Sequence, residues 1–343
     1  MAQINKPNTH FNTKLYTGDG TTSNSITGVN FKPDLVWIKV RNDTNNFVLY
    51  DVVRGANNTL RSSTTGVETN NTDAMSSFNA DGFTVGENAF NATNDAGFNF
   101  ISWNWLAGGT AVSNTQGTIA SQVSANQTAG FSIVSWTGTG SAGTIGTGLN
   151  ATPAMIIVKN RSAVENWRVW HNKLSANDKI VQLNLQDAES STTDFQPANN
   201  TTSVFGIGNN AQSNGSGNSM IAYCFAEKKG FSKFGSYIGT GNSDAPFIYT
   251  GFKPAFVLTK NISGANNWTI CDNKRNTYNP CDTVLNPNVA NIETTNNPQD
   301  LVSNGIKNRA IENNTNGSGF TYIYATFADS PLVGTNNIPA TAR

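Results

Sequence analysis

The run Phe31-Lys32-Pro33-Asp34-Leu35-Val36-Trp37-Ile38-Lys39 decides how this chain folds. A proline opens an apolar segment that a lysine closes, and the same pattern returns at residues 153–159 and 254–260. Each proline stands seventeen residues after the aromatic residue of an aromatic-Gly loop and fourteen before a large aromatic residue. The loops are 16–20, 136–140 and 237–241, and the later aromatics are Phe47, Trp167 and Trp268. Two spacings kept in three copies indicate a tandem repeat.

Each copy has the pattern of β-structure. The run after the proline is apolar at odd and even positions, which predicts a central strand covered on both faces. Residues 131–136 and 231–237 alternate with period two, as half-buried antiparallel strands do. The sequence shows no convincing amphipathic helix. We therefore predict an all-β chain of three tandem β-sandwich repeats, jelly-roll-like and arranged in a row.

The repeats set the predicted boundaries along the chain. The Gly/Ser/Thr-rich linker is expected to hold one edge strand near residues 118–123 and to give the first two repeats freedom, whereas the short joint 228–230 implies that repeats two and three touch. The segments are a polar leader 1–10, repeat one 11–107, the linker 108–130, repeat two 131–227, repeat three 228–328 and a polar tail 329–343.

Composition excludes several classes of function. The formal net charge is zero and 13% of residues are charged, so no basic face is expected for nucleic acid. The surface must instead use small polar residues, and the chain holds 51 asparagines and 40 threonines. No apolar run reaches the ~20 residues of a membrane span. Residues 1–6 carry no export signal, which favours synthesis and assembly in a cytoplasm.

Few residues are candidates for catalysis. The only histidines are His10 and His171, and no zinc-type spacing, Gly-x-Ser-x-Gly elbow or phosphate-binding loop is present. We therefore predict no catalytic, metal or cofactor-binding residues, no cofactor and no enzymatic activity. Which loops bind a receptor is not specified by the sequence. The odd set Cys224, Cys271 and Cys281 is no disulfide framework, and it leaves open whether the last two pair or stay free thiols.

One repeated position carries titratable groups. Asp51, His171 and Asp272 align, with Arg54 and Arg275 three residues after the two aspartates and Leu174 after the histidine. The functional interpretation is a carboxylate for a ligand or for glycosidic chemistry, which needs two carboxyls across one bond. The structural interpretation is an Asp–Arg pair that ties a strand end to its loop. We favour the second, because scaffold features recur between copies.

Three other repeated features also have a structural and a functional interpretation. Asp19, in the first aromatic-Gly loop, could ligate calcium, but threonine replaces it at positions 139 and 240, which favours a turn that needs glycine. The lysines that close the central strands form either a three-fold basic site or, as we favour, strand ends that reach solvent; they are Lys39, Lys159 and Lys260. The strand tryptophans are predicted to be mostly core; they are Trp37, Trp103, Trp105, Trp167, Trp170 and Trp268.

The chain resembles a repeat family of bacteriophages that infect marine bacteria and cyanobacteria. The resemblance covers about residues 11–328. The chain departs from the commonest pattern of the family in its short joint 228–230 and in Asp329, where repeat two has Glu227. The matching strings include Phe31-Lys32-Pro33-Asp34-Leu35-Val36-Trp37-Ile38-Lys39, Leu49-Tyr50-Asp51, Asp81-Gly82-Phe83-Thr84, Trp103-Asn104-Trp105 and Ile221-Ala222-Tyr223-Cys224-Phe225-Ala226-Glu227. Members are described as virion structural or tail-fibre-like proteins, and no catalytic residue is carried over.

The resemblance implies a phage structural protein on the surface of the virion. We expect host attachment of the tail-fibre type, with other virion proteins and a host cell-surface glycan as partners, without nucleic-acid binding or membrane insertion. Capsid decoration, or a head fibre, is the alternative, and a polysaccharide depolymerase is the remote one. A homotrimer is one arrangement to consider. Three like domains in one chain could equally imitate a trimer and match a three-fold site on a capsid.

Overall fold

Antiparallel strands in six sheets form the computed structural model, which describes residues 3–87, 93–333 and 339–340. The prediction of an all-β, sandwich-type chain is confirmed. The described helices are short: η1 (Pro7–Thr9), η2 (Pro197–Asn199) and α1 (Ala211–Asn214). Below, residues 11–107, 131–227 and 228–328 are called the first, second and third segments.

Each segment contributes an inner sheet and an outer sheet. The first has the inner sheet β1-β9-β3-β4-β5-β6 and the outer sheet β2-β8-β7. Its strands are β1 (Phe11–Thr17), β2 (Asn24–Thr27), β3 (Leu35–Val40), β4 (Val48–Asp51), β5 (Asn58–Arg61), β6 (Thr69–Asn70), β7 (Met75–Asn79), β8 (Gly82–Val85) and β9 (Asn99–Trp105).

The second segment repeats this order, and two strands of the preceding linker, β10 and β11, extend its inner sheet. Its inner sheet is β10-β11-β12-β19-β14-β15-β16-β17 and its outer sheet is β13-β18. The strands are β10 (Val112–Asn114), β11 (Ser121–Asn126), β12 (Phe131–Thr137), β13 (Gly143–Gly146), β14 (Met155–Asn160), β15 (Arg168–His171), β16 (Lys179–Gln182), β17 (Ser190–Ser191), β18 (Val204–Ile207) and β19 (Ser219–Phe225).

The third segment has the inner sheet β20-β27-β22-β23 and the outer sheet β21-β26-β25-β24. In all three inner sheets the last long strand lies between the first strand and the strand after the proline. The strands are β20 (Ser232–Ile238), β21 (Phe247–Tyr249), β22 (Phe252–Asn261), β23 (Thr269–Asp272), β24 (Cys281–Val284), β25 (Thr294–Val302), β26 (Gly305–Asn308) and β27 (Thr321–Pro331).

The apolar run after each proline is buried on both faces, as predicted, although in the third segment the strand β22 already begins at Phe252, before Pro254. On β3, Leu35 and Trp37 belong to a core shared by all three segments. The intervening Val36 and Ile38 pack with Phe83 of the outer sheet in the first segment's own core. The same alternation places Met155 and Phe256 in the shared core. This explains why the run after the proline is apolar at both odd and even positions.

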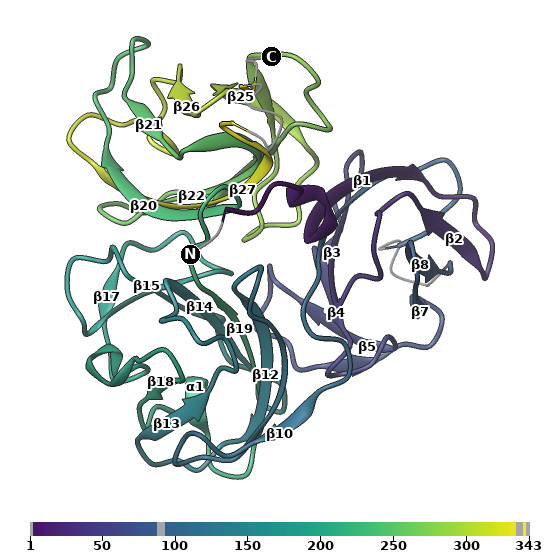
Figure 1. Cartoon of the computed structure of the whole chain (residues 1–343). Helices are drawn as coiled ribbons and strands as arrows, with labels where there is room; N and C mark the ends of the chain where they lie inside the picture. The colour runs from purple at the N-terminus through teal and green to yellow at the C-terminus, as the bar shows by residue number, and fades with distance from the viewer. Residues whose placement is uncertain (1–2, 88–92, 334–338, 341–343) are drawn as a thin grey trace.

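The segments surround a common centre instead of lying in a row, which corrects the predicted arrangement (Figure 1). Their inner faces are apolar, and each can be covered only by the other two. Trp105, Phe225 and Phe327 meet there, with ring centroids 5.6–6.4 Å apart. The central core therefore belongs to no single segment.

Neighbouring segments join head to tail and close a ring. The Glu68 amide donates to the Arg161 carbonyl at 2.9 Å, joining the first segment to the second. The Glu189 amide donates to Ile262 at 3.1 Å and the Glu293 amide to Arg41 at 2.9 Å, which completes the circuit. Each junction uses one surface from one segment and a different surface from the next, and such heterologous contacts form a ring when the rotation closes.

The leader and the linker are both part of the folded structure. Ile4, in the predicted polar leader, is buried in the shared core and its amide donates to the Lys229 carbonyl at 3.1 Å. The predicted linker holds two strands, β10 and β11, which pair in sequence onto β12. The prediction that the first joint is flexible is therefore wrong, because backbone N–H and C=O groups of the linker are hydrogen-bonded in the inner sheet. At the other end, β27 runs three residues past the predicted end of repeat three.

Candidate functional site

The titratable position of the repeats lies inside the ring. Asp51, His171 and Asp272 are each no more than 1% exposed, at the ends of β4, β15 and β23. Asp51 forms an ion pair with Arg54, and Asp272 forms one with Arg275 at 2.7 Å. The predicted Asp–Arg pairs are confirmed. They face neighbouring segments and not a groove, so they cannot act on a substrate from solution.

The neighbouring segment explains which residue stands at each junction. Asp51 accepts a hydrogen bond at 2.8 Å from the Tyr223 hydroxyl of the second segment. Asp272 lies 3.4 Å from the Trp103 indole nitrogen of the first. The third segment offers only a main-chain carbonyl, and there His171 Nε2 lies 3.2 Å from the Tyr324 oxygen. At two junctions an aspartate therefore accepts from a side-chain donor, and at the third the histidine donates to a main-chain carbonyl.

The buried histidine is held in its neutral form. Its Nδ1 accepts from the Lys173 amide at 3.1 Å, so Nε2 carries the proton donated to Tyr324. Desolvation lowers the pKa of His171 to about 3. A histidine that stays neutral and hydrogen-bonded on both nitrogens is part of the scaffold.

The three strand-end lysines are buried, and the prediction that they reach solvent is wrong. Lys159 Nζ donates to the carbonyls of Thr65 at 3.0 Å and Glu165 at 2.6 Å, on both sides of a junction. Lys260 Nζ likewise donates to Gln186 across the next junction at 2.8 Å. Desolvation lowers the pKa of Lys39 and Lys260 to about 7 and that of Lys159 to about 8. These lysines join loops and do not form a basic site.

The aromatic-Gly loops are built around a buried asparagine. The Asn214 oxygen accepts from the Thr139 amide at 3.1 Å, and its amide group donates to the Ser141 carbonyl at 2.8 Å. Asn94 and Asn316 make the corresponding bonds in the other segments. Asp19 accepts from Asn94 and from Thr21, so hydrogen-bond donors of the loop and its asparagine surround the carboxylate. The turn interpretation is confirmed by left-handed glycines at 20, 140 and 241.

The cysteines and the helices add no site. Cys271 and Cys281 are free, buried thiols, and their mutual hydrogen bond together with burial raises the pKa of Cys271. Among the described residues, no three His, Cys, Asp or Glu side chains are grouped to hold a metal ion. No helix in the described ranges has the length and apolar character needed to cross a membrane.

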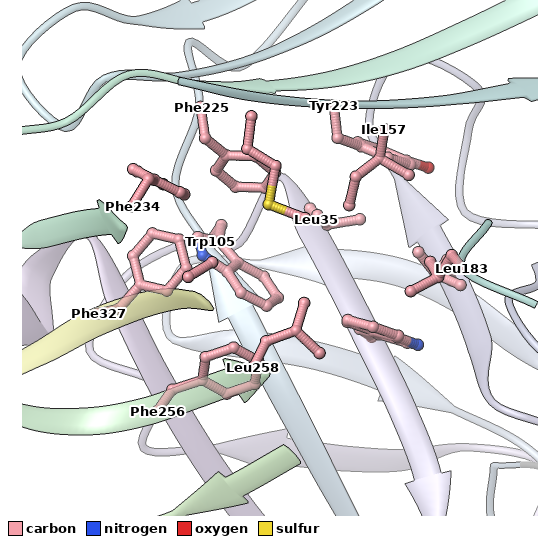
Figure 2. A pocket seen from close by; sticks show the side chains of 14 residues that line it. Leu35, Trp105, Ile157, Leu183, Tyr223, Phe225, Phe234, Phe256, Leu258 and Phe327 are labelled. Carbon is pink, nitrogen blue, oxygen red and sulfur yellow. The ribbon is translucent and has the colours of Figure 1, made fainter. Parts of the chain in front are cut away.

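The cavity at the centre of the ring is too small for an organic ligand. Its volume is about 30 Å³, and side chains from all three segments point toward it (Figure 2). Leu35, Ile157 and Leu258 are among them. This space is a packing imperfection in the shared core.

The surface of the second segment carries a wider groove, which we call the loop groove. Its volume is about 590 Å³, within the range of ligand sites. Within the described structure, the exposed Asn177 and Asn209 side chains have no hydrogen-bond partner, and Asp178 is the one carboxylate in the lining. The lining residues are Ala142, Asn177, Asp178, Thr192, Thr193, Phe195, Gln196, Pro197, Ala198, Asn199, Gly208 and Asn209.

A family model described as a domain of unknown function (DUF7483) matches residues 6–331. The chain belongs to the DUF7483 family. One model spans the end of the leader and all three segments, in keeping with the core that the segments share. No curated protein matches this DUF7483 chain.

Sequence reasoning missed the asparagines and the loop groove of this DUF7483 chain. Asn94, Asn214 and Asn316 are three among 51 asparagines, so their type carries no signal. Their spacing does: they lie 76, 76 and 77 residues after Gly18, Gly138 and Gly239. The loop groove has no counterpart in a repeated motif, because it arises where unlike loops of one segment meet.

Proposed function

We propose that this chain is a non-enzymatic bacteriophage protein, displayed on the virion after assembly in the host cytoplasm, that attaches to a host cell-surface saccharide. The loop groove is the observation that carries the proposal. The phage assignment rests on the sequence resemblance. A saccharide is recognised by hydrogen bonds to its hydroxyls, and the lining supplies amides and hydroxyls with little charge.

The loop groove is also held in place, which lowers the cost of binding. The Thr192 amide donates to the Asp178 carbonyl at 2.8 Å, and the Asn199 side-chain amide donates to Gln196 at 3.0 Å. Phe195 is 6% exposed and packs into the second segment's core below the groove. A site fixed in its binding shape loses little conformational freedom when a ligand enters.

The carboxylates argue against a depolymerase. Hydrolysis of a glycosidic bond by the usual mechanism needs two carboxyl groups on either side of that bond. Asp178 is the one acid of the lining, and Asp194 behind it is buried beside Arg168, with a 3.3 Å contact. Affinity would instead come from many copies on one particle, since later contacts become intramolecular after the first.

Capsid decoration is the second candidate, and the ring favours it. Three like segments around one centre give a single chain the approximate symmetry of a trimer (Figure 1). Such a chain fits a three-fold position of a protein shell as one copy. Three separate chains around one such position would exclude this arrangement.

Glycan binding tests the first candidate. Wild type and the Asn177→Ala/Asn209→Ala variant would be compared on an array of neutral host saccharides, with Asn172→Ala/Asn291→Ala as the matched control. Two lost hydrogen bonds predict about ten- to thirtyfold weaker binding by the first variant only. Binding to neutral glycans should change little with salt. Equal binding by all three proteins would reject the loop groove.

Cryo-electron microscopy of the intact particle separates the two candidates. Density for the ring at the tail periphery, with the loop groove outward, would support attachment. Density spread over the capsid lattice would make decoration the primary role.

A further inference from the structure

A second groove lies where the second segment passes into the third. Its volume is about 520 Å³, and we call it the joint groove. One wall is the joint itself and the other is the end of edge strand β21 with the turn after it. The lining residues are Glu227, Lys228, Lys229, Gly230, Ser232, Lys233, Tyr249, Thr250 and Gly251.

The wall formed by the joint is fixed by hydrogen bonds. The Ser232 hydroxyl accepts from the Lys228 amide at 3.0 Å, and the Ser232 amide donates back to the Lys228 carbonyl at 3.0 Å. Gly230 has a left-handed φ of 74°, which sets the sharp turn of the joint. The leader braces the outer side through the Ile4–Lys229 main-chain bond. The basic side chains of the joint are thus presented from a defined backbone.

Positive charge is in excess in the joint groove. Three lysines line it against one acid, and that acid, Glu227, already forms a 2.7 Å ion pair with Lys233. Lys229 is exposed, and no acidic side chain in the described structure pairs with it. Desolvation lowers the pKa of Lys228. Over the whole chain, by contrast, the 22 basic and 22 acidic residues cancel.

An aromatic ring stands beside these charges. Tyr249 is 58% exposed, whereas Ile248 beside it points into the third segment's core. The Thr250 hydroxyl donates to the Phe252 carbonyl at 2.6 Å and fixes the turn after Tyr249. An exposed aromatic face beside polar groups can cover the apolar C–H face of a sugar ring.

We propose that the joint groove binds an acidic saccharide, a sugar chain that carries carboxylate or sulfate groups. One ring lies on Tyr249, and its anionic group is bound by Lys229. This site goes beyond the proposed function and does not rest on it, because it lies on other loops and selects a charged ligand.

Calorimetric titration of the full chain with a galacturonate hexasaccharide tests the proposal. We expect binding that weakens as salt rises from about 0.05 M to about 0.5 M, and much weaker binding of a neutral hexasaccharide. Tyr249→Ala and Lys229→Gln should each weaken binding about tenfold. The matched controls are the exposed Tyr278→Ala and Lys32→Gln, which should bind as wild type does.

The joint-groove proposal fails if the neutral and acidic sugars bind alike. It also fails if both test variants bind as wild type does while their circular dichroism is unchanged. A hexaglutamate peptide or inorganic sulfate that competes as strongly as the sugar would show a general anion site and also reject it. Asn177→Ala/Asn209→Ala must leave this binding unchanged, so failure here and failure of the loop groove are distinguished.

Discussion

His171 occupies the position that carries aspartate in the other two segments, and its environment determines the exchange. The third segment presents Ala325 where the others present Trp103 and Tyr223, as the strand registers show. Without a side-chain donor opposite, a buried aspartate would lack a partner across the junction. Leu174 in place of arginine follows from the same change, since a neutral imidazole needs no counter-ion.

We predict that His171→Asp alone destabilises the chain by about 3 kcal/mol, because it buries a carboxylate without a cation. His171→Asp/Leu174→Arg should recover a large part of this loss by rebuilding the ion pair found at Asp51 and Asp272. Urea unfolding of the single and double variants measures both effects, and Leu174→Arg alone is the control. A double variant no more stable than His171→Asp would contradict the pairing.

The same histidine predicts a pH dependence. Its folded-state pKa is about 3, below the ordinary value of 6.5. Between these values the unfolded chain takes up a proton that the folded chain does not, so its contribution to stability is full above pH 6.5 and is lost as pH falls toward 3. Urea midpoints should therefore fall more steeply from pH 7 to pH 4 for wild type than for His171→Gln. Parallel curves would refute the assignment.

At the scale of elements, the aromatic-Gly loop depends on its asparagine. Asn214→Ala removes bonds to Thr139, Ser141 and Trp136 and leaves buried groups without partners. We expect a loss of about 3 kcal/mol, measured by thermal or urea unfolding. The exposed Asn209→Ala, five residues away, should change stability by less than about 0.5 kcal/mol. Similar losses for both variants would show that the loop is not held in this way.

Local pattern predicted the elements, whereas long-range contact determined their arrangement. The period-two and apolar runs gave β12, β14 and β22, because burial of each face repeats along the strand. The burial of Lys159 was not predictable, because its acceptors include Thr65, ninety-four residues earlier. The grooves were missed for the same reason, since their linings combine loops with no shared spacing.

At the scale of the whole molecule, the shared core makes the segments dependent on one another. Residues 131–227 alone would expose Ile157, Tyr223 and Phe225 to water. We predict that this fragment shows no cooperative unfolding transition by circular dichroism, whereas the full chain unfolds in a single step. A fragment with a sharp transition of its own would mean that the outer core of one segment is sufficient.

The closed ring of heterologous junctions also lets its parts change independently. In a homotrimer one substitution alters every junction at once, so a change must be tolerated three times. Here each junction has its own residues: Asp51 with Tyr223, Asp272 with Trp103, and His171 with a carbonyl. The loop groove lies on the second segment, and the joint groove lies where the second segment passes into the third. A single chain keeps the geometry of a trimer while each third can acquire a separate specificity.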